Sequence, residues 1–363
     1  MKLLYVNGTY EGGSILSTRE LLTRLPGHGV ESRLIIAQKE TAVAAYLRRR
    51  MTNLAVKLGG PEPDNIVARA NRLWGRKATK VAAAEWSSTA VENAAATVLG
   101  DWKPDVVVVS SVDRVAWRRI RRDTAKAGVK CVLYLREEAL LPHLNLTTPP
   151  DLVLANSRGL VDSCSALGWE AFLVPSVIDL SACEVESERT KALLINPTRA
   201  YGLERAVELA EACPDIGFVF QESTRLTPDE LGVVTSICER FSNIEFREFC
   251  TNPADIYRDA RVLLAPYTDF LESNRPRSVL EAQWNGIPVI GTSRAGLRDA
   301  TGAGGVLLAP CEVLEQWCRV LEGVFSESST YEELRAKSLE HARRPEVDPA
   351  AIGSSFVTII SEL

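Results

Sequence analysis

Histidine is scarce in this sequence, which holds only His28, His143 and His341 among 363 residues. Because the three lie far apart, they do not form a metal site by themselves. The eight cysteines include no CxxC pair, and most lie in apolar segments, where a thiol behaves as a small hydrophobic group. We therefore expect reduced, buried cysteines and neither disulfides nor zinc.

Long apolar runs are also missing. None reaches the roughly 18 to 20 residues that cross a membrane, and Met1 to Gly8 is too short in its apolar part for a signal peptide. A net charge of −5 gives no reason to expect nucleic acid as a partner. These absences favour a soluble, cytoplasmic enzyme or binding protein.

Short apolar runs alternate with amphipathic stretches, which is typical of βα units and a parallel sheet. The strands expected in the first half are Leu3 to Asn7, Arg33 to Ala37, Asp105 to Ser110, Lys130 to Leu135, Asp151 to Ala155 and Ala171 to Val174. Those expected in the second half are Ala192 to Asn196, Gly217 to Gln221, Ile244 to Arg247, Val262 to Ala265, Pro288 to Gly291 and Gly305 to Leu308. Two consecutive sets predict an α/β protein with two Rossmann-like, doubly wound domains.

A polar, acidic stretch near Ile178 to Thr190 is typical of a linker between domains. We therefore expect an N-terminal domain over residues 1–180. A C-terminal domain would follow over 190–343. Residues 344–363 would form a last helix that crosses back to the first domain.

Two places after strands carry residues suited to a ligand. Gly12 and Gly13 follow the first strand, where glycine lets the backbone approach a ligand and the next helix begins. A plain strand-to-helix turn would look the same. In the second half, Arg275 and Arg277 flank Pro276 at the start of a helix, an arrangement that suits a diphosphate. Glu281, one turn inside, can accept hydrogen bonds from a ribose diol or can simply complement the helix dipole.

The segment from Ala265 to Ser293 resembles the donor site of glycosyltransferase family 4. Glu281-Ala282 followed by Gly286-Ile287-Pro288-Val289-Ile290 matches the family pattern, and the resemblance covers roughly residues 190 to 310. It implies a GT-B fold with two domains facing a cleft and a nucleoside-diphosphate sugar as co-substrate, a UDP-sugar in preference to a GDP-sugar. It also implies that Glu281 holds the ribose. The donor-binding residues expected on these grounds are Gly12, Gly13, Arg199, Ser273, Asn274, Arg275, Arg277, Ser278, Val279 and Glu281.

The sequence departs from the family pattern in several places. Glu272 lies nine residues before Glu281, where the family spacing is eight, and Ser273 stands at the family position of the first glutamate. Tyr201 stands where a lysine is usual. The family's histidine is absent after the strands that end near Ser110 and Leu135. We take Glu272, Asp113 and Arg136 as catalytic candidates.

The resemblance implies retention of the donor's anomeric configuration. The sequence has no DxD motif, so we expect a reaction without a metal or another cofactor. The acceptor would bind to the first domain near Asp113, Arg114 and the run from Arg136 to Glu138, although any of these can be a solvated strand end.

The stretch from Lys39 to Lys80 holds ten basic residues against three acidic ones. It can contact an anionic membrane surface or an acidic acceptor, or it can be a solvated helix face. The acceptor would accordingly be phosphorylated, lipid-linked or a small metabolite.

Two other functions fit the same fold. One is a sugar-nucleotide epimerase, against which the shortage of histidines counts. The other is a catalytically silent subunit that binds a nucleotide sugar or a partner protein, which the departures from the family pattern leave open.

Overall fold

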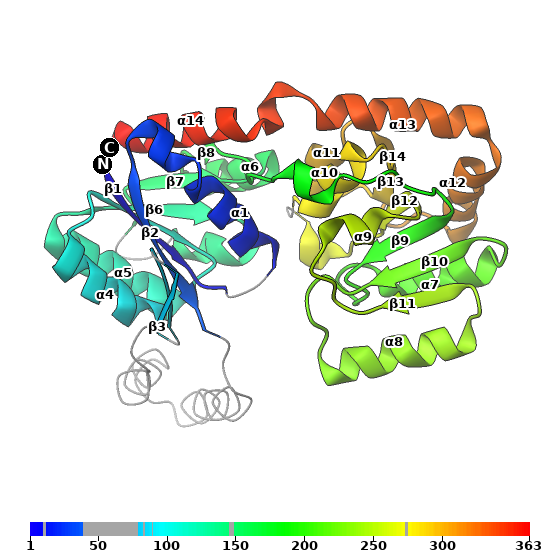
Figure 1. The fold of residues 1–363 in the computed structure, drawn as a ribbon, viewed down its shortest axis with the longest axis horizontal. Coiled ribbons are helices and arrows are strands. Elements are labelled where there is room, and N and C mark those ends of the chain that lie inside the picture. Colours follow the sequence, from blue (N-terminus) through cyan, green and yellow to red (C-terminus); the bar gives the residue numbers. More distant parts are fainter. Residues whose placement is uncertain (10–11, 39–78, 83, 89, 145–148, 273–274) are drawn as a thin grey trace. The chain divides into compact units, whose positions relative to one another are not determined.

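The computed structural model describes residues 1–363 except 10–11, 39–78, 83, 89, 145–148 and 273–274. The chain divides into two compact units (Figure 1). Unit 1 comprises Met1–Asn156, Leu160–Ser176 and Gly353–Leu363, and unit 2 comprises Ser157–Gly159 and Val177–Ile352. Among the described residues, no helix combines the length and apolar character needed to cross a membrane.

Unit 1 is built on a sheet with the strand order β3-β4-β2-β1-β5-β6-β7-β8. Its strands are β1 Lys2–Asn7, β2 Glu31–Ala37, β3 Thr79–Ala82, β4 Glu85–Ser88, β5 Val106–Ser110, β6 Lys130–Leu135, β7 Leu152–Ala155 and β8 Phe172–Leu173. All neighbours are parallel except the edge pair β3 and β4. The strands β5 and β6 are buried almost throughout because helices cover both faces.

The helices of unit 1 lie on both faces of its sheet. They are α1 Gly13–Leu22, η1 Leu25–His28, α4 Val91–Trp102, α5 Arg114–Ala127, η2 Glu138–His143, α6 Arg158–Ala166 and the last turns of α14 Pro349–Ser361. One core joins α4 and α5 to side chains such as Val107, Val109 and Leu133. Tyr5 and Asn7 alternate with the core residues Leu4 and Val6 of β1, so they point to the opposite face, where Asn7 donates to Thr18 of α1.

Unit 2 is built on a fully parallel sheet with the order β11-β10-β9-β12-β13-β14. Its strands are β9 Lys191–Ile195, β10 Gly217–Gln221, β11 Ile244–Arg247, β12 Ala260–Ala265, β13 Val289–Thr292 and β14 Gly305–Leu308. Its helices are η3 Leu180–Cys183, α7 Leu203–Ala212, α8 Pro228–Arg240, α9 Pro253–Tyr257, η4 Asp269–Leu271, α10 Arg277–Trp284, α11 Ala295–Thr301, α12 Leu314–Ser326, α13 Ser328–Ala342 and η5 Pro345–Val347. Two separate cores, one on each face, hold the sheet.

The expectation of two doubly wound, parallel-sheet domains is confirmed. In each unit the chain first builds strands outward on one side of a central strand and then returns to build on the other side. The strand order therefore reverses between β1 and β5 in unit 1 and between β9 and β12 in unit 2. Ligands of such sheets bind beyond the carboxyl ends of the strands at these switch points.

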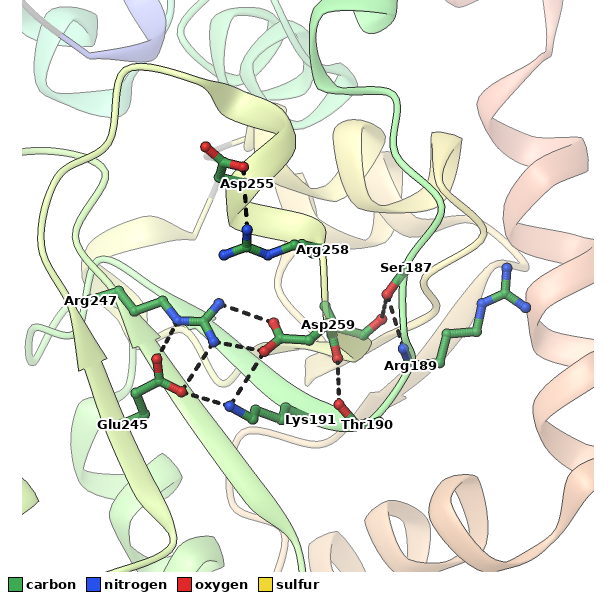
Figure 2. A network of polar contacts seen from close by, with 10 residues as sticks. Ser187, Arg189, Thr190, Lys191, Glu245, Arg247, Asp255, Arg258 and Asp259 are labelled. Atoms are coloured by element: carbon green, nitrogen blue, oxygen red, sulfur yellow. Dashed lines mark hydrogen bonds and ion pairs between the residues drawn. The ribbon is translucent and has the colours of Figure 1, made fainter.

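A charged network also fastens the sheet of unit 2 (Figure 2). Arg247 donates through Nη1 to Asp259 Oδ1 at 3.0 Å and through Nη2 to Asp259 Oδ2 at 2.6 Å. Its Nε donates to Glu245 at 2.7 Å, and Lys191 Nζ donates to the same carboxylate at 2.6 Å. The network links β9 and β11 to the residue that precedes β12.

The eight cysteines, all within the described residues, form no disulfide. Cys131, Cys164, Cys183 and Cys213 are buried, as expected, whereas Cys311 is exposed. Burial raises the pKa of the Cys131 thiol to about 12, so this group stays protonated and unreactive at neutral pH.

Candidate functional site

At the switch point of unit 2, the loops that follow β9 and β12 make a backbone contact that only glycine permits. Gly202 has φ +82°, and a Cβ on it would lie 2.0 Å from the carbonyl oxygen of Pro266. The loop after β9 therefore lies directly on the loop after β12. Thr268 strengthens the contact, because its backbone N–H and its hydroxyl both donate to the carbonyl of Ala200 at 3.1 Å.

Unit 1 contains an equivalent backbone contact. A Cβ on Gly8, after β1, would lie 1.9 Å from the carbonyl oxygen of Ser111, after β5. Ser111 itself has φ +52°, a conformation that costs a residue with a side chain about 1–3 kcal/mol. Both sheets thus bring their two central loops into backbone contact at the place where a ligand of this fold class binds.

Helix α10 carries the residue on which the donor-site prediction depends. It begins at Arg277 after Pro276, and its residue Val279 is fully buried. The carboxylate of Glu281, in the second turn, is 14% exposed and is held on both sides. Tyr257 donates its hydroxyl to Oε2 at 2.7 Å, and Arg277 donates Nε to Oε1 at 3.2 Å.

Tyr257 was not singled out from the sequence as a site residue. It is the last residue of α9 and is fully buried. Burial, together with the charge of Glu281, raises the pKa of its hydroxyl well above the usual value, so that it remains a donor at neutral pH. Only the fold brings it to Glu281, which lies on another helix.

The predicted phosphate-binding cations have different environments. Arg199 is 79% exposed and lies 3.8 Å from Glu204, a weak surface pair. Arg275 is only 8% exposed, and its Nε lies 3.6 Å from Asp299. Arg277 contacts Glu281 on its own helix. Arg199 is therefore the most accessible of the three, and Arg275 is packed against α11.

The remaining donor-site predictions on this unit are placed as follows. Ser278 lies in the first turn of α10; burial raises the pKa of the Tyr267 hydroxyl, and Ser278 acts in the opposite direction. Ser273 and Asn274 lie outside the described residues.

Glu272, a catalytic candidate, directly follows η4 and contacts the start of α11. Its carboxylate accepts hydrogen bonds from Arg294 Nη1 and from the backbone N–H of Ala295, both at 3.0 Å. Its own carbonyl accepts from the N–H of Gly296 at 2.8 Å. These contacts give Glu272 a structural role at the start of α11, whether or not it also contacts a sugar.

In unit 1, Gly12 precedes α1 with φ +90°, and Gly13 is the first helical residue. Asn7, at the end of β1, is fully buried and donates to Ser14 at 3.2 Å and to Thr18 at 3.0 Å. The helix that follows the glycines is thereby fixed over the end of β1.

Asp113 and Arg136 belong to opposite faces of this sheet. Asp113 caps α5, because its Oδ1 accepts from the N–H of Ala116 at 2.8 Å. Arg136 is buried on the α1 face, stacks 4.4 Å from the ring centre of Tyr134 and donates to Ser176 at 3.2 Å.

Buried polar side chains line the carboxyl edge of the sheet on the α1 face. They end or directly follow the neighbouring strands β1, β5, β6 and β7 and are Asn7, Ser110, Arg136 and Asn156. Ser110 Oγ and Asn156 Oδ1 have no hydrogen-bond partner among the described residues. Because buried polar atoms are nearly always paired, this edge has free capacity for a ligand or water.

The loop after β6 supplies a histidine that the sequence did not place near the other candidates. His143, the last residue of η2, contacts the carbonyl oxygen of Val112 through Nε2 at 3.0 Å, directly before Asp113. Desolvation lowers its pKa, so the ring is neutral at neutral pH. The basic segment from Lys39 lies outside the described residues up to residue 78, and its membrane contact stays a prediction.

No protein-family model matches the chain, and no curated protein matches it. Solved structures do resemble it along its whole length. HepE of Anabaena in complex with UDP-glucose has a TM-score of 0.73 at 13% identity, with 100% of both chains covered. A glycosyltransferase of Rickettsia africae has a TM-score of 0.69 at 12% identity, covering 99% of this chain and 98% of that one.

The UDP-GlcNAc 2-epimerase of Neisseria meningitidis, bound to UDP-GlcNAc, has a TM-score of 0.56 at 13% identity, with full coverage of both chains. Similarity at this level of identity shows the fold. The predicted GT-B fold is confirmed, and the resemblance to family 4 stays a prediction.

Proposed function

We propose that this chain is a glycosyltransferase that takes a sugar from a UDP-sugar. The observation that carries the proposal is the carboxylate of Glu281. It lies one turn inside a helix that starts at the switch point of unit 2 and is fixed by Tyr257 and Arg277 while remaining partly accessible. A preorganised carboxylate at this place suits the diol of a nucleotide ribose. The UDP and UDP-sugar complexes among the structural neighbours support a UDP donor.

The diphosphate would bind at the amino end of α10. The N–H groups in the first turn of α10, at Ser278 and Val279, would attract an anion, and Arg277 and Arg199 would add positive charge. Stabilising the departing diphosphate is the main electrostatic demand of sugar transfer, and these groups can meet it without a metal ion. Retention of the anomeric configuration is part of the proposal and rests on the resemblance to family 4.

The acceptor would bind to unit 1 at the carboxyl edge of its sheet. The unpaired Ser110 Oγ and Asn156 Oδ1 and the nearby guanidinium of Arg136 suit a hydroxylated acceptor, which is phosphorylated, lipid-linked or a small metabolite. Gly12 and Gly13 would let the acceptor or the donor phosphates approach the start of α1.

A second function, a subunit that binds a nucleotide sugar without turning it over, is favoured by the contacts of Glu272. Its carboxylate is already engaged by Arg294 and Ala295, which competes with a role at the donor sugar. Release of UDP from UDP-glucose or UDP-GlcNAc separates the two functions, since a silent subunit releases none. Formation of a C2 epimer without UDP release would instead identify an epimerase.

The proposal is tested by thermal unfolding with UDP, GDP, ADP and CMP, each with and without its common sugars. A ligand that binds only the folded state raises the melting temperature. At a ligand concentration of 100 times the Kd, it adds about 2.7 kcal/mol to the free energy of unfolding. We expect UDP and one UDP-sugar to raise it and the other nucleotides to have little effect. No shift with any of them would contradict a donor site.

A further inference from the structure

The two oxygens of Glu281 are each fastened by a different element. Tyr257, from α9, contacts Oε2, and Arg277, from the first turn of α10, contacts Oε1. The arginine contact is an i,i+4 pair that α10 can form alone. The tyrosine contact comes from another helix, so it ties the rotation of the carboxylate to α9.

Both carboxylate oxygens of Glu281 can accept a further hydrogen bond. A carboxylate oxygen accepts about two hydrogen bonds, and among the described residues each oxygen of Glu281 receives one. One acceptor position therefore remains on Oε1 and one on Oε2. Two adjacent acceptors held in one plane match two hydroxyl groups on neighbouring carbon atoms, which a ribose presents at C2′ and C3′.

We propose that Tyr257 is a positioning residue that holds Glu281 for simultaneous recognition of both ribose hydroxyls, so that the site selects the intact diol. This inference rests on the proposed nucleotide-sugar function. The terminal torsion of a glutamate is broad, so without the tyrosine hydroxyl the carboxylate can turn toward Arg277. The two acceptor positions then no longer face the diol together.

A purely structural role for the same contact makes a different prediction. If the hydrogen bond only ties α9 to α10, its loss loosens the whole site and weakens every nucleotide alike. If it orients the carboxylate, its loss weakens only ligands that carry the diol. The comparison of two ligands therefore separates the roles.

The test measures UDP and 2′,3′-dideoxyuridine diphosphate binding to the full chain by calorimetry. Tyr257→Phe keeps the ring and removes the hydroxyl. We expect it to weaken UDP about tenfold, in the range for a hydrogen bond to a charged group, and to change dideoxy-UDP less than about twofold. Tyr331→Phe is the matched control, because Tyr331 is buried in unit 2 and its hydroxyl has no partner among the described residues. It should change neither affinity.

Equal losses for both ligands in Tyr257→Phe, or no loss for either, would overturn the inference while leaving the donor site intact. Absence of UDP binding in the wild type would overturn the proposed function as well, and is seen before any variant is made. Glu281→Gln gives a second reading that does not depend on Tyr257→Phe folding. It should remove most of the wild-type preference for UDP over dideoxy-UDP, and an unchanged preference would refute the role of the carboxylate.

Discussion

Replacing Asp259 by asparagine should destabilise unit 2 strongly. Asp259 forms a two-point contact with Arg247, and both side chains are largely buried (Figure 2). Removing one partner of a buried ion pair costs about 3–5 kcal/mol when the other charge is left alone. Arg247 keeps Glu245 as a partner, so we expect a smaller loss, about 2 kcal/mol. For a unit of this size that loss lowers the melting temperature by about 4–8 °C.

The effect should depend on pH in a definite direction. The hydrogen bond from Arg247, followed by that from Lys191, lowers the pKa of Glu245 to about 2. Burial acts to raise the pKa of Asp259, but its contacts with Arg247 and Lys191 outweigh burial and lower it. Because the folded pKa values lie below the unfolded ones, the network stabilises the fold above about pH 4.5. That contribution is lost as the pH falls toward 2.

Melting temperatures of the wild type and Asp259→Asn, measured from pH 7 down to pH 3, test both statements. Glu245 is 47% exposed, so solvent screening reduces its share, and most of the difference should come from Asp259. Glu211→Gln, which breaks the exposed pair with Arg240, is the control and should change stability by less than about 0.5 kcal/mol. A loss in Asp259→Asn no larger than in this control, or one that grows as the pH falls, would contradict a stabilising ion pair between Asp259 and Arg247.

Gly202→Ala should destabilise the chain by about 2 kcal/mol or more, because the new Cβ would meet the Pro266 carbonyl. Gly232→Ala is the control: its Cβ meets nothing, so the melting temperature should be unchanged or raised. Arg277→Ala should weaken UDP more than uridine in calorimetry, and equal losses for both would count against a phosphate contact. Arg275→Ala should lower the melting temperature while changing UDP affinity little, because the side chain is buried beside Asp299; a large loss of UDP affinity with unchanged stability would reverse this assignment.

The parallel sheets were predictable because their strands are apolar runs. The expected strand from Asp105 to Ser110 corresponds to β5, which begins one residue later and is buried throughout. The edge strands β3 and β4 were not predicted. They are short, and β4 contains Glu85 and two serines, so no apolar run marks it. Its place in the sheet comes from pairing with β2, a partner about fifty residues away in the sequence.

The site was predictable only in part, for a related reason. The sequence located the loop and helix that carry Arg277 and Glu281, because a proline and two arginines mark the start of α10. It offered no sign that Arg275 lies beside Asp299, that Tyr257 reaches Glu281, or that His143 reaches Val112. Each of these contacts joins segments that only the folded sheet brings together.

We propose that Glu281 marks the donor site of a sugar-nucleotide enzyme. This proposal is tested most directly by measuring UDP binding calorimetrically to the wild type and to Glu281→Ala, with folding of the variant checked by its melting temperature. We expect a measurable affinity for the wild type and a loss of about tenfold or more in a variant that remains folded. Equal affinity of the two proteins for UDP would contradict it.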